Sequence, residues 1–329
     1  MARVVRFHEI GDAAVLRIED LDVPPPAPGH IRIRVSAIGV NRADATFRAG
    51  NHLVLPKLPS GLGYEAAGTV ESVGDGVSGF DLGDIVSAIP QMEPDLYNTY
   101  GEFASIPASF AVKHPSVLSM VEAAALWSSY LTAYGALVEV AHVSDGDFVV
   151  ITAASSSVGQ ASVQIANMLH ATPIATTRGR QKVQALLAAG AGEVIVTEEE
   201  DVHDRIMSIT RGNGARVVFD PVGGPGVNAL ANAMSPNGIL LEYGLLSGKV
   251  TPFPLFASIT KRLTMAGYRI DNLDAGRLAR GKRFIIGGVE RGVIRPLIAK
   301  TFPLGEIVQA HRFLESNLQV GKIVVTTDA

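Results

Sequence analysis

The chain has 329 residues, of which 47% are hydrophobic and 18% charged, with a formal net charge of −4 and no cysteine. This length exceeds the size at which one hydrophobic core usually stops growing, so two domains are expected. The acidic balance argues against a nucleic-acid partner or an anionic membrane surface. The absence of cysteine excludes disulfides, a thiolate nucleophile and cysteine-ligated metal or iron–sulfur sites.

Neither a targeting signal nor a membrane span is visible. Charges interrupt residues 1–15 throughout, so they lack the apolar core of a secretory signal peptide. No run of about 18 apolar residues is present to cross a bilayer. We therefore expect a cytoplasmic protein with no membrane and no nucleic acid among its partners.

The first third of the chain has the pattern of a β domain. Residues 23–29 (VPPPAPG) are too rich in proline for a sheet interior and are expected to form an extended connector. Apolar and basic residues then alternate over residues 31–35, as in a half-buried antiparallel strand. Short strands are expected at residues 67–73 and 84–89, separated by glycines, which is typical of a compact β-barrel.

From about residue 120 the pattern changes to helices that alternate with strands. Apolar residues at helical spacing predict a helix within residues 121–140. The expected strands after it are residues 148–152, 173–176, 193–197, 216–220 and 239–243, and the expected helices are residues 158–169, 181–189 and 202–209. This alternation indicates a parallel, doubly wound sheet. A helix near residues 281–291 and a strand at 323–326 follow, and this last part is expected to return to the first domain.

Residues 149–178 carry the most informative signal. They predict an apolar strand, a turn of small residues, a helix and a second strand, which is the first half of a dinucleotide-binding unit. Backbone N–H groups at the start of such a helix point at a pyrophosphate. Only Gly159 remains of the usual glycine pattern, because Ser156 and Ser157 stand where glycine would be easiest. Taken alone, the turn also fits any α/β protein.

Arg178 closes this unit and indicates the cofactor. An acidic residue about 20 positions after the turn would hold the ribose hydroxyl of NAD, whereas arginine accommodates the 2′-phosphate of NADP. Arg180 and Lys182 follow at a helix start, where positive charge is unfavourable unless an anion binds. A solvated helix start is the alternative. Asp220 and Tyr243 end two further strands, at the sheet edge where ligands bind, although ordinary loop chemistry would also explain them.

Seven motifs of the chain occur together in one family. They are GVNRAD (39–44), LPSGLGYEAAGTVESVG (58–74), LGDIV (82–86), YGEFA (100–104), YLTAYGAL (130–137), AASSSVG (153–159) and GKIVV (321–325). Because it carries these motifs in this order, the chain resembles the medium-chain dehydrogenase/reductase superfamily, specifically its zinc-free quinone oxidoreductase (zeta-crystallin-like) branch. The resemblance covers essentially all residues.

The resemblance implies an α/β fold with a Rossmann doubly wound parallel sheet and a GroES-like β-barrel domain. The GroES-like domain would comprise residues 1–122 and 265–329 and would bind the substrate. The Rossmann domain would comprise residues 123–264 and bind NADP, with the active site in the cleft between the two. A homodimer or homotetramer, often joined through the edge of the Rossmann sheet, is also implied.

The resemblance further assigns roles to individual residues. Candidate catalytic residues are Asn41, Asp44, His52 and Tyr64. For the cofactor it implies Thr132 against the nicotinamide ring or its ribose, a pyrophosphate cradle of Ser156, Ser157 and Val158, Arg178 and Lys182 at the 2′-phosphate, and Tyr243, Gly244 and Leu245 beside the nicotinamide amide.

The chain departs from the family pattern at several positions. Zinc-dependent relatives carry cysteine and histidine where Asn41 and Tyr64 stand, so no metal is expected. Many relatives have tyrosine in place of His52, and in related enoyl reductases that tyrosine is a candidate proton donor. A tyrosine that relatives often place near Thr197, beside the adenosine phosphate, is missing.

The cofactor motif, the resemblance and the missing zinc ligands together predict hydride transfer from NADPH to a small-molecule substrate, either a quinone or an α,β-unsaturated carbonyl. Without zinc an alkoxide lacks its usual electrophile, whereas conjugated acceptors spread the developing charge. His52 or Tyr64 would supply or relay the proton. However, His52 could equally be an exposed loop residue, and Tyr64 could merely fill the space of a missing metal ligand. Substrate choice would depend on the loops at residues 91–100 and 251–259.

Two alternatives stay open. One is an enoyl-thioester or 2-enoate reductase of the same family, in which Lys261 and Arg262 could hold a coenzyme A phosphate. The other is a non-catalytic NADPH-binding protein, either a sensor or a structural protein.

Overall fold

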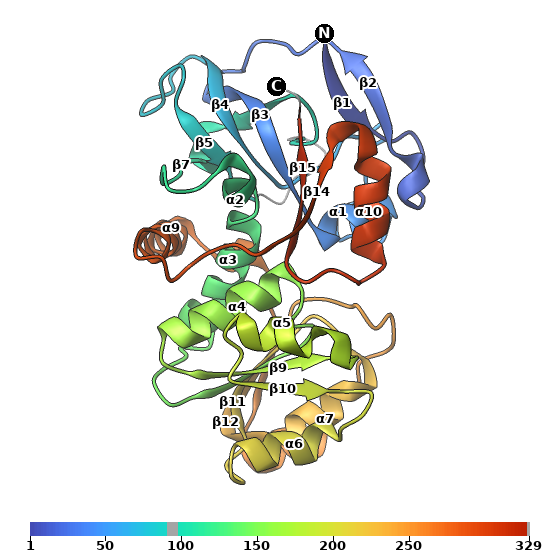
Figure 1. Cartoon of the computed structure of the whole chain (residues 1–329), viewed down its shortest axis with the longest axis vertical. Coiled ribbons are helices and arrows are strands. Elements are labelled where there is room, and N and C mark those ends of the chain that lie inside the picture. Colours follow the sequence, from blue (N-terminus) through green and yellow to red (C-terminus); the bar gives the residue numbers. More distant parts are fainter. Residues whose placement is uncertain (91–97, 328–329) are drawn as a thin grey trace. The chain divides into compact units, whose positions relative to one another are not determined.

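A computed structural model describes residues 1–90 and 98–327 of the chain. It separates into two compact units, the first comprising residues 1–128 together with the chain from residue 295 onward, the second residues 129–294 (Figure 1). Part of the loop expected at residues 91–100 lies outside the described residues, namely residues 91–97.

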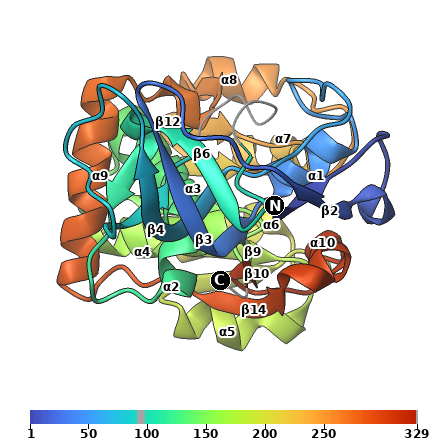
Figure 2. The ribbon, with the colours of Figure 1, turned by 90° about the horizontal axis from the view of Figure 1, so that it is seen from above.

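The first unit is built around a mainly antiparallel sheet. Its strands are β1 (Ala2–Arg6), β2 (Arg17–Leu21), β3 (His30–Val40), β4 (Glu65–Val73), β5 (Ile85–Ala88), β6 (Phe103–Pro107), β7 (Ala111–Lys113), β14 (Ile298–Pro303) and β15 (Lys322–Thr326), and its helices are α1 (Arg42–Arg48), α2 (Met120–Ala124) and α10 (Ile307–Glu315). β1 and β2 pair with each other, and the larger sheet has the order β14-β15-β3-β4-β5-β7. Figure 2 shows β6 beside β3, with which it pairs antiparallel.

Strand β3 forms for the reason that its sequence suggests. Ile31, Ile33 and Val35 are completely buried, while the arginines between them point to the other face. The expected return of the chain end is confirmed, because β15 pairs antiparallel with β3.

The second unit is the expected doubly wound domain. Its strands are β8 (Phe148–Ile151), β9 (Thr172–Thr177), β10 (Glu193–Val196), β11 (Ala215–Asp220), β12 (Met234–Glu242) and β13 (Thr264–Gly267), and its helices are α3 (Trp127–Tyr134, whose first two residues belong to the first unit), α4 (Ser157–Met168), α5 (Val183–Ala188), α6 (Val202–Ile209), α7 (Val227–Asn232), α8 (Leu255–Lys261) and α9 (Ala275–Glu290). All neighbouring strands are parallel, in the order β10-β9-β8-β11-β12-β13. Figure 1 shows α4 and α5 on one face of this sheet and α6 and α7 on the other.

The strand order reverses between β8 and β11, which is where open α/β sheets bind their ligands. On the face that packs against α6 and α7, the core contains Val150, Val218 and Leu240 from three adjacent strands. Because side chains alternate along a strand, the residues two positions further on share this face at the carboxyl edge.

Both domain boundaries differ from those expected near residues 122 and 264. Residues 265–294 belong to the second unit because β13 completes its sheet and Phe284 of α9 packs against Tyr134 of α3. Gly281 of α9 lies against Tyr134, so closely that a Cβ there would come within 3.0 Å of the ring. The single helix expected within residues 121–140 is instead α2, α3 and a six-residue π-helical segment, Gly135–Val140. No helix among the described residues has the length and apolar character needed to cross a membrane.

Candidate functional site

The turn between β8 and α4 presents a capped helix start at the reversal point of the sheet. Ser156 is the N-cap of α4, and its hydroxyl oxygen accepts a hydrogen bond from the Gly159 N–H at 3.0 Å. Its φ of −70° needs no glycine, so serine is unstrained there. The left-handed conformation lies instead at Ala153, with φ of 46°. Gly159 is required by space, because a Cβ would lie 2.6 Å from the backbone of Ala154.

Basic side chains gather beside this turn. Lys182 donates a hydrogen bond from Nζ to the Ser155 hydroxyl at 3.0 Å, which joins the start of the next helix to the turn. Burial and the neighbouring positive charge of exposed Arg178 lower the pKa of Lys182. Arg180 is paired with Glu199. Two cations that repel each other next to a helix N-terminus form a suitable binding place for a phosphate.

Further along the sheet edge, the loop after β12 begins at Tyr243. The Tyr243 ring stacks on Phe219 with centroids 4.0 Å apart, and its N–H donates to the Asp220 carbonyl at 3.0 Å. Burial and then the Asp220 charge raise the pKa of Tyr243, so its hydroxyl stays protonated. Gly244 follows, and Leu245 is exposed.

The other predicted cofactor residues of this unit lie on two helices. Val158 and Ser157 form the first turn of α4 and are partly exposed. Thr132 is half-buried on α3. The second unit thus places Ser156, Ser157 and Val158 in one turn, with Lys182 bonded to that turn and Arg178 close to Lys182.

In the first unit, a buried ammonium group organises the residues around Asn41. Lys322 of β15 is 2% exposed and forms an ion pair with Glu65 of β4, which is 0% exposed. Lys322 Nζ also donates to Asn41 Oδ1 at 2.7 Å, and Asn41 Nδ2 donates to Glu65 Oε1 at 3.2 Å. The remaining Glu65 oxygen accepts the Ser128 N–H at 2.8 Å. These contacts fix the orientation of the Asn41 amide.

Asp44 lies directly behind this network, inside the protein. It lies in the first turn of α1 and accepts hydrogen bonds from the N–H of the N-cap residue Asn41 at 2.7 Å and from the Tyr100 hydroxyl at 2.9 Å. Its side chain is fully buried, and burial raises its pKa to about 7 against the effect of these hydrogen bonds. A carboxyl group in this position can hold Asn41 in place, but it does not reach the surface.

His52 and Tyr64 are in direct contact. His52 Nδ1 accepts the Val54 N–H at 3.1 Å, so the neutral ring carries its proton on Nε2. That nitrogen donates to the Tyr64 oxygen at 3.1 Å, which leaves the Tyr64 O–H for a different acceptor. Tyr64 is buried and His52 half-buried. The two candidate proton donors therefore form one dyad.

Comparison with known proteins identifies the family. The alcohol dehydrogenase GroES-like domain model matches residues 27–116, and the zinc-binding dehydrogenase model matches residues 157–278. The chain is 32% identical to quinone oxidoreductase 1 of Escherichia coli, over 98% of each chain, and 30% identical to a 2-haloacrylate reductase of a Burkholderia species, over 100% of this chain and 99% of the relative. The structure of an Escherichia coli quinone oxidoreductase complexed with NADPH superposes with a TM-score of 0.91, at 31% identity, over 99% of this chain and 100% of that one.

The chain belongs to the quinone oxidoreductase branch of the medium-chain dehydrogenase/reductase family. Its two units are the GroES-like and the Rossmann domain of that family, as the sequence motifs predict.

One of the two matching family models is named for zinc, but the residues of this dehydrogenase/reductase do not fit a catalytic zinc ion. The set formed by Asn41, Tyr64 and Glu65 contains one carboxylate and neither cysteine nor histidine. The carboxylate is already paired with Lys322, whose ammonium group places a positive charge among the donor atoms. A cation would have to displace that charge.

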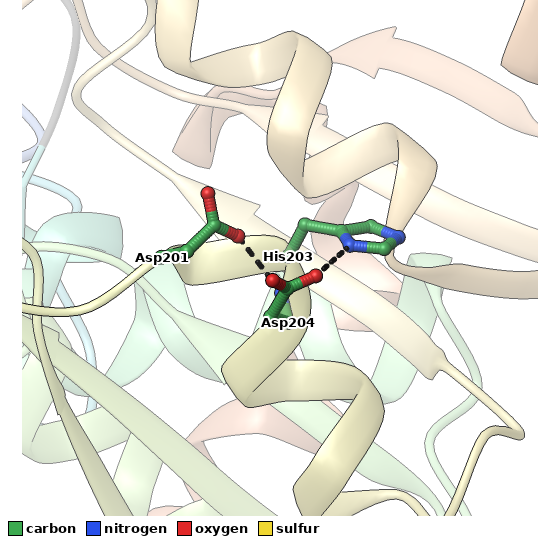
Figure 3. Close-up of side chains that lie close together, drawn as sticks. All are labelled: Asp201, His203 and Asp204. Carbon is green, nitrogen blue, oxygen red and sulfur yellow. Dashed lines mark hydrogen bonds and ion pairs between the residues drawn. The ribbon is translucent and has the colours of Figure 1, made fainter.

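Elsewhere in this dehydrogenase/reductase, one group of three potential ligands occurs within the described residues. Asp201, His203 and Asp204 lie at the start of α6 (Figure 3). Asp201 is the N-cap and accepts the Asp204 N–H at 2.9 Å, and His203 Nδ1 lies 2.9 Å from Asp204 Oδ1. These are the contacts of an exposed helix cap, and we assign no metal to them.

Two residues of this dehydrogenase/reductase were missed by the sequence reasoning. Lys322 was noted only within the GKIVV motif, although a lysine in an otherwise apolar strand must find a partner if it is buried. Glu242 is the last residue of the apolar strand β12 and lies on the same face as Leu240. This position in the sequence indicates a buried acid at the carboxyl edge of the sheet.

Proposed function

We propose that this chain is a reductase that transfers a hydride from NADPH to a quinone or another α,β-unsaturated carbonyl without zinc. The observation that carries the proposal is the positive charge at the α4 turn, where Lys182 is bonded to Ser155 and lies close enough to Arg178 for that charge to lower its pKa. A 2′-phosphate on the cofactor would neutralise both.

Within the second unit, each part of the cofactor has a candidate partner. Ser156, Ser157 and Val158 would receive the pyrophosphate at the helix N-terminus. Tyr243, Gly244 and Leu245, with Thr132, would hold the nicotinamide end. The cofactor, when bound, supplies the hydride.

The first unit supplies the proton. Reduction of a quinone or an enone needs one hydride and one proton, and Tyr64 would donate its hydroxyl proton to the acceptor. His52 Nε2 would keep its proton and stabilise the resulting Tyr64 oxyanion through its hydrogen bond, and a proton from solvent would then restore the Tyr64 hydroxyl. The neighbouring Leu53 and Leu55 are exposed and offer an apolar surface to such an acceptor.

Asn41 and Asp44 have different parts in this proposal. The amide of Asn41, oriented by Lys322 and Glu65, would contact the nicotinamide end of the cofactor or the substrate. Asp44 would act as a positioning residue, since it is buried and bonds to the Asn41 backbone.

The ammonium group of Lys322 beside Asn41 and Glu65 supports zinc independence. Conjugated acceptors tolerate the absence of a Lewis acid better than simple ketones, because conjugation spreads the developing charge.

A 2-enoate reductase is the second candidate function, because one relative is named a 2-haloacrylate reductase and haloacrylates are conjugated acids. A coenzyme A thioester is less favoured. Lys261, the proposed phosphate ligand, donates instead to the Asn232 and Met234 carbonyls, and Arg262 donates to Asn237.

We also propose a homodimer through β13. This strand has a single neighbour in the described sheet, so one edge is available to pair with a second copy. Exposed apolar residues accompany it on and before α8, namely Phe253, Leu255, Phe256 and Ile259. A molar mass of one chain in light scattering would contradict this proposal. The cytoplasmic location stays a prediction.

The test of the function is a substrate panel for NADPH oxidation. It would contain 1,4-benzoquinone, 9,10-phenanthrenequinone, a small enone, 2-chloroacrylate and crotonyl-coenzyme A. Turnover of the quinones or the enone is expected. Turnover of 2-chloroacrylate alone would favour the 2-enoate reductase. Tight NADPH binding without any turnover would favour the sensor.

A further inference from the structure

The carboxyl edge of the Rossmann sheet holds two acidic residues side by side. Asp220 ends β11 and Glu242 ends β12, and the two are direct partners in the strand register. They share the face of Val218 and Leu240, so their side chains project in the same direction. The proposed function described above assigns no role to Glu242.

The two carboxyl groups have different surroundings. Asp220 accepts three hydrogen bonds, from the Thr152 hydroxyl, from the Val222 N–H at 2.8 Å and from the Gly223 N–H at 3.1 Å. Both oxygens of Glu242 are buried and accept no hydrogen bond from an N–H or O–H group of the described residues, and the side-chain partner of Glu242 is the Asp220 carboxylate. Three donors stabilise a charge on Asp220, whereas nothing stabilises one on Glu242.

The charged groups near the pair do not change this conclusion. Lys249, on the loop after β12, is exposed, and Lys261 of α8 is bound to carbonyls at the opposite end of β12. Tyr243 is protonated, and Thr251 from the same loop accepts the Gly224 N–H at 2.7 Å. Burial, followed by the Asp220 charge, raises the pKa of Glu242 to about 8.

The pair lies directly under the loop that follows β11. Glu242 Oε2 is 3.8 Å from where a Cβ on Gly223 would stand, and Gly223 has φ of 62°. The loop is further bound to the one after β12, through the Leu246 N–H to the Pro221 carbonyl at 3.0 Å and the Ser247 N–H to the Val222 carbonyl at 2.9 Å. A movement of Asp220 would therefore shift both loops at the ligand-binding edge.

We propose that Glu242 is a positioning residue for the cofactor, which keeps its carboxyl proton near neutral pH, donates it to Asp220 and so holds both loops of the sheet edge in their binding conformation. This inference rests on the proposed binding of NADPH. When the proton leaves above neutral pH, two adjacent negative charges repel each other and oppose an anionic dinucleotide. NADPH affinity then falls with rising pH.

The test compares wild type with Glu242→Gln, which imitates the protonated acid and keeps a donor toward Asp220. The dissociation constant of NADPH is measured by calorimetry at pH 7 and pH 9. We expect it to rise about three- to tenfold in wild type, as a pKa change of up to one unit on binding would produce, and less than about twofold in Glu242→Gln. Glu290→Gln, which removes an exposed carboxylate at the end of α9, should behave like wild type. Equal pH dependence in wild type and Glu242→Gln would overturn the proposal.

A second measurement does not need the cofactor. Infrared difference spectroscopy at pH 6.5 should show one carbonyl band of a protonated carboxylic acid that wild type has and Glu242→Gln has lost, whereas the band of protonated Asp44 is common to both proteins and cancels. No loss of the band would refute the shared proton even if NADPH binds. If the band is lost as expected but neither protein binds NADPH, the proposed function is wrong and the cofactor role of Glu242 falls with it.

Discussion

Lys322 and Glu65 form an ion pair from which water is excluded, and Asn41 is bonded to both members. Removing one member of such a pair by mutation leaves the other charge buried without a partner, which costs about 3–5 kcal/mol of stability. The pair thus links the stability of the GroES-like unit to the orientation of a candidate catalytic amide.

Replacement of Lys322 by methionine should lower the free energy of unfolding by about 3–5 kcal/mol, because the buried Glu65 carboxylate would lose its counter-charge. Urea denaturation measures this loss. The double variant Lys322→Met/Glu65→Gln should recover part of the stability. Arg269→Ala breaks an exposed pair with Asp271 and serves as the control, with an expected cost below about 1 kcal/mol. A comparable loss in Lys322→Met and in the control would contradict the account.

Arg178→Ala and Lys182→Ala should each weaken NADPH binding about tenfold or more, since each removes a charge-assisted contact to the 2′-phosphate. NADH binding should change less than about threefold. Arg180→Ala is the matched control, because its guanidinium is engaged with Glu199. Fluorescence titration with both dinucleotides gives the constants, and an equal loss for NADPH and NADH would remove the phosphate assignment.

Tyr64→Phe should reduce kcat for an enone about 10²-fold or more, the usual range for loss of a general acid. His52→Gln should have a smaller effect, because the glutamine amide can still donate to Tyr64. Stopped-flow measurement of NADPH oxidation separates this step from cofactor binding. Tyr130→Phe removes a buried hydroxyl bonded to Gln164 and provides the control. A wild-type kcat in Tyr64→Phe would exclude Tyr64 as the proton donor.

Asp44 should make the protein less stable as the pH rises from about 4 to 7. Its pKa is raised from 3.8 to about 7, mainly by burial, so the folded state holds a proton that the unfolded chain releases in this window. The loss amounts to at most about 4 kcal/mol at pH 7. In Asp44→Asn the stability curve should be flatter over this range, and a curve parallel to that of wild type would show that Asp44 is ionised in the folded protein.

The elements of the fold could largely be predicted from local pattern. Alternation over residues 31–35 identified β3, and alternating strands and helices identified the Rossmann unit. The boundary at residue 264 was wrong in its placement because α9 joins the second unit through contacts such as Gly281 against Tyr134, which no local pattern encodes.

Only part of the candidate site could be predicted from the sequence, because its contacts join residues that are far apart along the chain. Asn41 and Lys322 are separated by 281 positions, and the ion pair with Glu65 depends on β15 pairing with β3. His52 and Tyr64 were both candidates, but their hydrogen bond depends on the path of the loop that joins them. The acid pair of Asp220 and Glu242 needed the register of two parallel strands.

The most direct test of the central claim is NADPH oxidation with 9,10-phenanthrenequinone by protein treated with a chelator. The account predicts turnover that is unchanged by EDTA and a kcat/KM for NADPH at least about tenfold above that for NADH, as expected for one charge-assisted phosphate contact. Activity that is lost on chelation and restored by zinc, or an equal use of NADH, would contradict it.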